Sequence, residues 1–284
     1  RTGSGKTVAF AVPTVVALSS SASTRRPNFP RALVLVPTRE LAAQVAATVR
    51  PIAATMGLRV AVIHGGVSQG PQVAALRAGV DILIACPGRL EDLAQQGHCK
   101  LGAVEVCVLD EADHLADLGF LPAVKRILDA TPAGGQRMLF SATLDRAVDT
   151  VVRRYLTNPV THSVDSADAT PPDLEHHAFT VTADDKAAVV RELASGKERS
   201  LLFTRTKHAA KKLAKDLSAR GIPAVDLHGN LSQPQRDRNL AAFADGSVRV
   251  LVATDIAARG IHVDDIALVI HVDPPTEHKA YQHR

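Results

Sequence analysis

The sequence predicts an α/β protein with two domains, each built on a mostly parallel sheet. The chain has 284 residues, enough for two domains of roughly 150 residues each. Short β-branched runs alternate with helical patterns through most of its length, which is the order of elements in α/β domains. Several of these runs are apolar at nearly every position, which is typical of parallel strands covered on both faces.

The first half of the chain contains four such runs, which we expect to be strands buried on both faces. They are residues Ala32–Val36, Asp81–Ile84, Val104–Leu109 and Met138–Phe140. After the first run, Pro37 ends the strand and Thr38 is placed to cap a helix. Apolar residues then recur at helical spacing from Leu41 to Ile52. This segment is therefore a βα unit.

The pattern is interrupted once and then starts again. Residues 163–173 are acidic, small and rich in proline, without periodicity, and we interpret them as a linker between domains at 1–162 and 174–284. The second domain is expected to contain three strands and two helices. The strands are Ser200–Phe203, Val248–Ala253 and Ile266–Val272, and the helices are Lys207–Leu217 and Gln233–Phe243.

Composition excludes several classes of protein. Hydrophobic residues make up 46% and charged residues 22% of the chain, as in ordinary globular proteins and unlike disordered chains. The three cysteines include no C-x-x-C pair, so neither a zinc cluster nor a disulfide framework is indicated. The longest apolar run, Val8–Leu18, is shorter than the roughly 20 residues of a membrane span. We expect a cytoplasmic protein with no membrane partner.

The charge distribution permits a nucleic-acid partner. The net charge of +4 divides into +5 for residues 1–162 and −1 for the remainder, so any contact with a polyanion must be local. The chain has only seven Phe, two Tyr and no Trp, which argues against a binder built on base stacking. Contacts to phosphate would then have to dominate.

A glycine-rich segment near the start predicts a phosphate loop. Gly3 and Gly5 would let backbone N–H groups approach phosphate oxygens, Lys6 would reach the outer phosphates, and Thr7 would be a ligand of Mg²⁺. The first position of the full pattern would precede Arg1. The alternative is an accidental glycine-rich turn.

A carboxylate cluster follows the expected strand Val104–Leu109. If that strand and the one before the phosphate loop end at one crevice, Asp110 would face Mg²⁺ and Glu111 would orient and deprotonate the attacking water. The alternative for Asp110–Asp113 is a solvated helix start that stabilises the helix dipole.

Taken in order, these segments resemble the motif series of DEAD-box RNA helicases, and the resemblance extends over essentially the whole chain. In the first half the matching segments are Thr2–Thr7 (motif I), Pro37–Ala42 (motif Ia), Gly65–Gly66 (double glycine), Cys86–Leu90 (motif Ib), Asp110–Asp113 (motif II) and Ser141–Thr143 (motif III). In the second half they are Leu202–Thr206 (motif IV), Gln233–Arg236 (Q-x-x-R), Ala253–Gly260 (motif V) and Tyr281–Arg284 (the opening of motif VI).

The resemblance implies two tandem RecA-like domains that bind ATP with Mg²⁺ at their interface and RNA across their tops. It implies nucleotide contacts from Thr2, Gly3, Ser4, Gly5, Lys6 and Thr7, with Thr7 and Asp110 holding the metal. The implied catalytic residues are Lys6, Asp110, Glu111, Ser141, Thr143 and Arg259. Those implied for RNA are Pro37, Thr38, Arg39, Gly65, Gly66, Pro87, Gly88, Arg89, Arg205, Gln233, Arg236, Thr254 and Asp255.

Each of these groups also has a structural alternative. Gly65–Gly66 could be a strand-end turn and Arg89 a surface residue in the first turn of a helix. Ser141–Thr143 could be a helix cap, and Arg205, Arg236 and Arg259 could be salt-bridge partners.

The chain departs from the family pattern at two positions and at both ends. Cys86 stands where motif Ib usually has Thr, and His262 stands where motif V usually has an Asp associated with the ribose of ATP. The glutamine motif and the arginines of motif VI would lie outside Arg1 and Arg284. Arginine fingers such as those of motif VI raise the rate of phosphoryl transfer on the order of 10³- to 10⁵-fold. We therefore expect a weakly stable fragment with little activity of its own.

We expect an ATP-dependent RNA helicase in which RNA-stimulated ATP hydrolysis drives local duplex unwinding or remodelling of RNA–protein complexes. Its partner would be single-stranded RNA or a short duplex, bound through the backbone without sequence preference. One alternative is a DNA-directed or translocating helicase, and another is an ATP-gated RNA clamp or scaffold with little unwinding.

Overall fold

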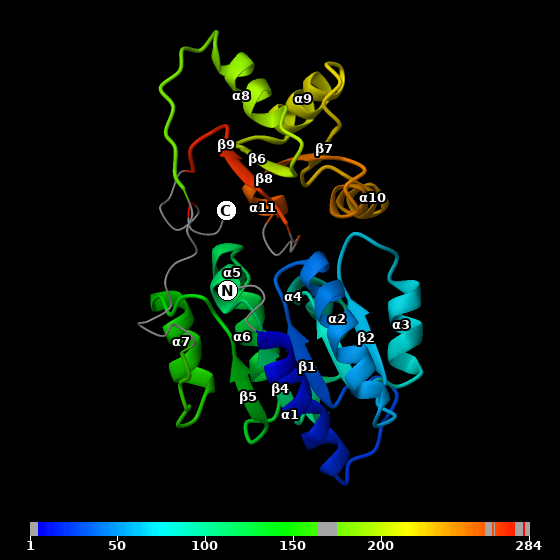
Figure 1. The fold of residues 1–284 in the computed structure, drawn as a ribbon. Coiled ribbons are helices and arrows are strands. Elements are labelled where there is room, and N and C mark those ends of the chain that lie inside the picture. Colours follow the sequence, from blue (N-terminus) through cyan, green and yellow to red (C-terminus); the bar gives the residue numbers. More distant parts are fainter. Residues whose placement is uncertain (1–4, 164–174, 259–262, 264, 276–280, 282–284) are drawn as a thin grey trace. The chain divides into compact units, whose positions relative to one another are not determined.

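The computed structural model describes residues 5–163, 175–258, 263, 265–275 and 281 (Figure 1). The chain divides into two compact units, Arg1–Val164 and Asp165–Arg284. Both are α/β units, as the sequence predicts, and they are described separately below. All but one of the residues of the expected linker 163–173 lie outside the described residues.

The first unit is built on a five-stranded sheet in the order β2-β3-β1-β4-β5, and every pair of neighbouring strands is parallel. The strands are β1 (Ala32–Leu35), β2 (Val60–Ile63), β3 (Ile82–Ala85), β4 (Val106–Leu109) and β5 (Gln136–Leu139). The helices are α1 (Lys6–Ser20), α2 (Arg39–Ala54), α3 (Gly70–Arg77), α4 (Pro87–Gln95), α5 (Ala112–Asp117), α6 (Leu121–Asp129) and α7 (Arg146–Tyr155), with a short 3₁₀ turn at Leu101–Ala103.

Helices cover both faces of this sheet, which explains its continuous apolar strands. Along β1, Ala32 and Val34 pack with α1 and α2 on one face, whereas Leu33 and Leu35 pack with α3, α4, α6 and α7 on the other. Side chains alternate between the faces of a strand, so a strand covered on both sides needs an apolar residue at every position. The parallel-sheet prediction is therefore confirmed for the reason that motivated it.

Strand β5 departs from this expectation. We expected Met138–Phe140 to be buried on both faces, but Gln136 is exposed and residues 137–140 are only half-buried. The expectation was wrong because β5 pairs with β4 alone among the described strands and forms one edge of the sheet. The sequence analysis also missed β2 and β7, which are four-residue strands with half-buried positions instead of continuous apolar runs.

The second unit has a four-stranded parallel sheet in the order β7-β8-β6-β9. Its strands are β6 (Ser200–Thr204), β7 (Ala224–Leu227), β8 (Val250–Thr254) and β9 (Leu268–His271), and its helices are α8 (Lys186–Ala194), α9 (Lys207–Ser218), α10 (Gln233–Ala244) and α11 (Asp255–Ala258). Each strand and helix predicted for this half is present within about two residues of its expected ends. Thr206 fixes the start of α9 because its hydroxyl accepts a hydrogen bond from the Ala209 amide at 3.2 Å.

Within the described part of the chain, no helix combines the length and the apolar character that a bilayer span requires.

The strands of the first unit end in one row. Their last residues, Ile63, Ala85, Leu35, Leu109 and Leu139, are register partners across the whole sheet. The loops that leave the five strands at their carboxyl ends therefore start from one line.

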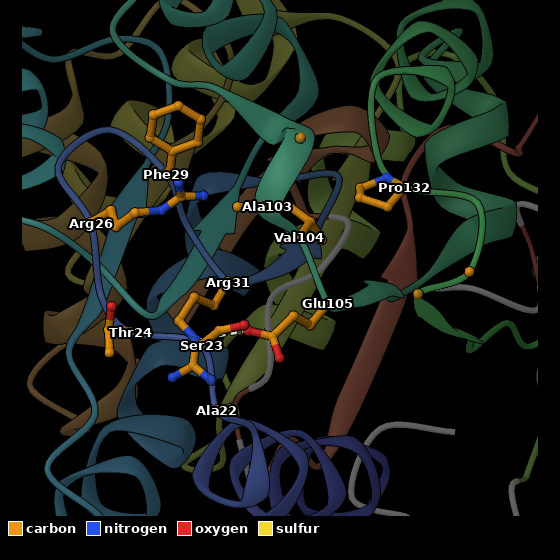
Figure 2. Close-up of a pocket in the computed structure, with 13 residues that line it drawn as sticks. Ala22, Ser23, Thr24, Arg26, Phe29, Arg31, Ala103, Val104, Glu105 and Pro132 are labelled. Carbon is orange, nitrogen blue, oxygen red and sulfur yellow. Dashed lines mark hydrogen bonds and ion pairs between the residues drawn. The ribbon is translucent and has the colours of Figure 1, made fainter.

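The amino ends of the strands, opposite this row, are joined by a largely buried network of ion pairs. Asp81 is 1% exposed and accepts hydrogen bonds from Arg25 Nε at 2.7 Å and from the Arg59 amide at 2.8 Å. Arg31 lies 3.7 Å from Asp81 and donates to Glu105 at 2.8 Å. Figure 2 shows the Arg31–Glu105 pair in a hollow of about 660 Å³ at the amino ends of the strands. This network joins β1, β3 and β4.

We expect Asp81→Ala to lower the free energy of unfolding of the first unit by about 3 kcal/mol, because it removes the buried carboxylate that accepts from Arg25 and takes one of two carboxylates away from the buried Arg31. The control is Asp149→Ala, which removes an exposed ion pair with Arg153 and should change stability by less than about 0.5 kcal/mol. Urea denaturation followed by circular dichroism measures both. Equal effects of the two substitutions would show that the network does not stabilise the unit.

Candidate functional site

The residues singled out in the first unit follow the carboxyl ends of its strands. Asp110 and Glu111 follow β4, and Phe140 and Ser141 follow β5. The segments after β1, β2 and β3 are Pro37–Arg39, Gly65–Gly66 and Cys86–Arg89. Because the strand ends share one row, segments that are up to about a hundred residues apart in sequence leave the same edge of the sheet.

Asp110 and Lys6 interact at the carboxyl ends of the strands. Asp110 is 3% exposed, and burial raises the pKa of its carboxyl from 3.8 to about 6, while the Lys6 ammonium opposes the shift and Glu111 adds to it. Lys6 is the first residue of α1 and follows Gly5, whose φ of 77° is left-handed. The lysine of the phosphate loop and the first acid of motif II therefore lie close enough to sense each other's charge.

Glu111 adopts an unusual backbone conformation. Its φ of 49° and ψ of 56° are left-handed, and it precedes the first residue of α5. Its amide donates to Asp110 Oδ1 at 3.0 Å, and its carboxylate Oε2 lies 3.1 Å from His114 Nδ1. A left-handed non-glycine residue costs about 1 to 2 kcal/mol and is common at functional sites.

Asp113 links motif II to motif III through buried hydrogen bonds. Its Oδ2 accepts from the Thr143 amide at 3.2 Å and from the Thr143 hydroxyl at 3.3 Å, and its own amide donates to Ser141 Oγ at 3.2 Å. Asp113 is 3% exposed, so the alternative of a solvated helix start is wrong for both Asp110 and Asp113. The alternative of Ser141–Thr143 as a helix cap is also wrong, since Asp145 caps α7.

Motif Ia and the double glycine lie against each other. Thr38 caps α2, as predicted, by accepting from the Leu41 amide at 3.2 Å. The Arg39 guanidinium occupies the space where a side chain on Gly66 would stand, and Gly66 has a φ of 81°. The positive φ therefore favours glycine here, whereas a Cβ would displace only the flexible end of the Arg39 side chain.

Gln72, which the sequence analysis missed, fixes the loop that carries these glycines. Its Oε1 accepts from the His64 amide at 3.1 Å, and its Nε2 donates to the carbonyls of His64 and Ser68 at 3.1 and 3.3 Å. A buried glutamine on a helix gives no local sequence signal of this kind, because its partners are set by tertiary packing.

Motif Ib begins α4 at the next strand end. Cys86 is buried at the helix start, and burial raises the pKa of its thiol to about 12. Pro87 is buried and Gly88 is exposed. Arg89 Nη2 donates to the Val67 carbonyl at 3.2 Å, and its side chain is 14% exposed, so the alternative of a surface residue is wrong. Its buried Nη1 has no hydrogen-bond partner among the described residues.

The second unit presents its motif residues in the same way. Thr204 and Thr254 end neighbouring strands as register partners, and Arg205 and Asp255 follow them. The amide of Arg205 donates to Asp273 at 2.9 Å, and Lys186 donates to the same carboxylate at 2.9 Å. Asp273, which was also missed, thus anchors the exposed Arg205 loop.

The glutamine and the arginine of the Q-x-x-R segment are buried, whereas the two residues between them are exposed. Gln233 Nε2 donates to Asp237 at 2.8 Å, and Arg236 Nη2 donates to the Ala257 carbonyl at 3.3 Å, which joins α10 to α11. Thr2, Gly3, Ser4, Arg259 and His262 lie outside the described residues.

Comparisons with known proteins give a consistent result. The family model described as DEAD/DEAH box helicase matches residues 1–151, and the one described as helicase conserved C-terminal domain matches residues 185–284. A maize protein named DEAD-box ATP-dependent RNA helicase 3A, chloroplastic, is 41% identical over the whole chain, and the ATP-dependent RNA helicase RhlB of Pseudomonas putida is 38% identical. The chain spans 39% of the maize protein's length and 73% of the bacterial protein's length.

Solved structures agree with these relatives. The structure of Saccharomyces cerevisiae Dbp5 bound to RNA and ADP BeF3 is similar over 99% of this chain and 72% of its own, with a TM-score of 0.83 and 26% identity. A DEAD box protein from Methanococcus jannaschii is 33% identical over the whole chain and 76% of its own, with a TM-score of 0.51. These proteins confirm the expected pair of RecA-like α/β domains.

The raised pKa of Asp110 predicts a pH dependence of stability. The folded state binds this proton more tightly than the unfolded state, so the resulting stabilisation is complete below about pH 3.8 and is lost as the pH rises through about 6. Asp110→Asn removes this effect, because an amide does not titrate in this range. Between pH 5 and pH 8 the wild type should therefore lose about 1 kcal/mol of unfolding free energy relative to the variant. Urea titrations of both proteins without nucleotide at these two pH values measure the difference, and a constant difference would contradict the assignment.

The packing of Arg39 on Gly66 predicts different effects at the two neighbouring glycines. Gly66→Ala should destabilise the first unit by about 1 to 2 kcal/mol, because alanine is strained at this φ, and its Cβ should also move the flexible end of the Arg39 side chain. Gly65→Ala is the matched control, since a side chain there has no neighbour within 4 Å, and it should cost less than about 1 kcal/mol. Denaturant midpoints compare them; similar losses at both positions would contradict the described packing.

Proposed function

The chain belongs to the DEAD-box helicase family, and from this membership we propose that the protein containing it is an ATP-dependent RNA helicase. In this proposal, RNA-stimulated ATP hydrolysis drives local unwinding of RNA duplexes or remodelling of RNA–protein complexes. The observation that supports it most directly is the interaction of Lys6 with Asp110 at the carboxyl ends of the strands. Glu111, whose backbone is left-handed, follows Asp110 directly in the sequence.

We propose that this edge binds ATP and Mg²⁺. Thr2, Gly3, Ser4 and Gly5 would contribute backbone N–H groups, Lys6 would bind the outer phosphates, and Thr7 and Asp110 would hold the metal. The donor set fits, because Mg²⁺ in such sites takes one or two protein oxygens and otherwise phosphate and water. Asp110 is a buried carboxylate whose nearby cation compensates its burial only in part, so an arriving cation would favour its ionised form. When bound, Mg²⁺ would neutralise phosphate charge.

Glu111 is proposed as the general base. A water oxygen attacks the γ-phosphorus while the Glu111 carboxylate accepts one of its protons, and the bond from the γ-phosphorus to the bridging oxygen breaks. ADP leaves with that oxygen, and phosphate and one proton are the remaining products. Arg259 would stabilise charge on the transferring group.

RNA is proposed to bind through its backbone, across the strand ends of both units. The first unit would contribute Pro37, Thr38, Arg39, Gly65, Gly66, Pro87, Gly88 and Arg89, and the second Arg205, Gln233, Arg236, Thr254 and Asp255. Cations, hydroxyls and exposed glycine backbone suit phosphate and ribose, and they do not read bases. The unpartnered Nη1 of Arg89 and the exposed backbone of Gly88 support this assignment in the first unit.

Ser141 and Thr143 are proposed to couple hydrolysis to domain closure. Their hydrogen bonds to Asp113 join the segments that follow β4 and β5, and Asp113 is two residues from the proposed general base. The alternative of an ATP-gated RNA clamp or scaffold with little unwinding is less well supported, because the proposed base Glu111 is adjacent to the Lys6–Asp110 pair in the first unit.

We further propose domain limits of 1–162 and 174–284.

We also propose a cytoplasmic location. The cysteines Cys86, Cys99 and Cys107 are free and buried, which suits a reducing compartment. The maize relative is named as chloroplastic, so a fractionation experiment on the native host is the direct test.

The general-base proposal is tested by Glu111→Gln in the full-length protein. We expect kcat for RNA-stimulated ATP hydrolysis to fall by at least about 10²-fold, with ATP and RNA affinities within a few-fold of wild type, because the amide keeps the shape but accepts no proton. Asp149→Asn, which changes an exposed carboxylate of α7, is the control and should turn over normally. Unchanged turnover in Glu111→Gln would exclude this residue as the base.

A further inference from the structure

A histidine that none of the motifs requires lies in contact with the proposed base. His114 is one helical turn after Glu111, and its Nδ1 lies 3.1 Å from Glu111 Oε2. Glu111 precedes α5 in a left-handed conformation, and His114 lies in the first turn of that helix, so the contact joins the helix to the residue before it. The His114 side chain is 9% exposed, so the imidazole contacts the carboxylate from the interior of the unit.

The rest of Glu111 is already fixed, which leaves the carboxylate as the mobile part. Its backbone is held in a left-handed conformation and donates to Asp110. A free glutamate side chain samples several rotamers, and restricting it before the reaction lowers the entropic barrier to proton transfer. His114 is the side chain that the structure places to do this.

His114 is itself anchored to the motif II–motif III network. Its backbone amide donates to Asp113 Oδ1 at 3.0 Å, and Asp113 Oδ2 accepts from Thr143. The ring therefore stands on the same element that connects β4 to β5. A shift of that element would move the imidazole and the carboxylate together.

The other ring nitrogen has an unfavourable environment. His114 Nε2 is buried and has no hydrogen-bond partner among the described residues. A buried polar atom without a partner destabilises a fold, so stability alone does not explain a histidine at this position. The contact of Nδ1 with the Glu111 carboxylate gives a reason for a histidine at this position.

We propose that His114 is a positioning residue for ATP hydrolysis: its Nδ1–H donates to Glu111 Oε2 and holds the carboxylate so that Oε1 faces the attacking water. Oε1 then accepts the proton from the water as the water oxygen bonds to the γ-phosphorus. His114 does not exchange a proton in this step. The inference rests on the proposed function, because it assigns His114 a role toward the same base.

Three substitutions separate the positioning role from packing. Asn places its amide nitrogen near the position of Nδ1, Gln places it near Nε2, and Leu has a similar volume with no donor. In the full-length protein we expect His114→Leu and His114→Gln to lower kcat by about tenfold, with KM for ATP and for RNA within about threefold. His114→Asn should stay within about threefold of wild type in every parameter.

A double substitution provides a readout that a packing defect would not reproduce. With Glu111→Gln there is no base to position, so adding His114→Leu should leave the single-turnover hydrolysis rate within about twofold. Circular dichroism melting identifies any variant that fails to fold. If His114→Leu is one of them, the comparison of His114→Asn with His114→Gln decides.

The outcomes distinguish this inference from the function on which it rests. Wild-type kcat in His114→Leu or, if that variant is unfolded, in His114→Gln would overturn the positioning role and leave the helicase proposal intact. Equal losses in the Asn and Gln variants, or a further tenfold loss in the Glu111→Gln background, would also overturn it. A wild-type protein without RNA-stimulated hydrolysis would overturn the proposed function and this inference together.

Discussion

The register row across the first sheet is the constraint on which the candidate site depends. Five parallel strands end on one line, and at about 4.8 Å between neighbours the line spans about 19 Å. Loops from this line therefore start close enough together to form the ATP and RNA sites proposed above. A slip of β4 by one residue would turn Asp110 toward the opposite face of the sheet, away from the Lys6 ammonium, since side chains alternate along a strand. Strand pairing therefore controls the chemistry directly.

The sequence predicted the elements that carry their own local signal. Apolar runs identified parallel strands because both faces of such strands are buried, and the hydroxyls of Thr38 and Thr206 mark two helix starts in the structure, the first of which was predicted. The interaction of Lys6 with Asp110 was also predicted, because the carboxyl ends of parallel strands share an edge. These inferences need only the period of a strand and the direction of its neighbours.

The remaining features depend on which elements meet in space. The half-burial of β5 follows from its place at the edge of the described sheet, which an apolar triplet does not encode. Gln72 and Asp273 were not predicted, because Gln72 binds the backbone of the loop after β2 and Asp273 binds the Arg205 amide and the Lys186 side chain, which are far away in sequence. The burial of Asp113 could not be predicted either, since the Thr143 that binds it is 30 residues away. In each case a polar side chain has a role that only tertiary packing assigns.

The two buried aspartates of the first unit show how stability and function are separated along one sheet. Asp81 and Asp110 are almost equally buried, at 1% and 3% exposed, and stand at opposite ends of the strands. Asp81 contacts the side chains of Arg25 and Arg31 and a backbone amide, so its charge is compensated within the fold. Asp110 has one backbone amide and the Lys6 charge, and its pKa stays raised. A buried carboxylate that the protein compensates only in part favours the arrival of a cation, whereas a compensated one favours folding alone. The strand ends that we propose to bind ATP and Mg²⁺ are thus the ends at which the fold leaves charge to be neutralised.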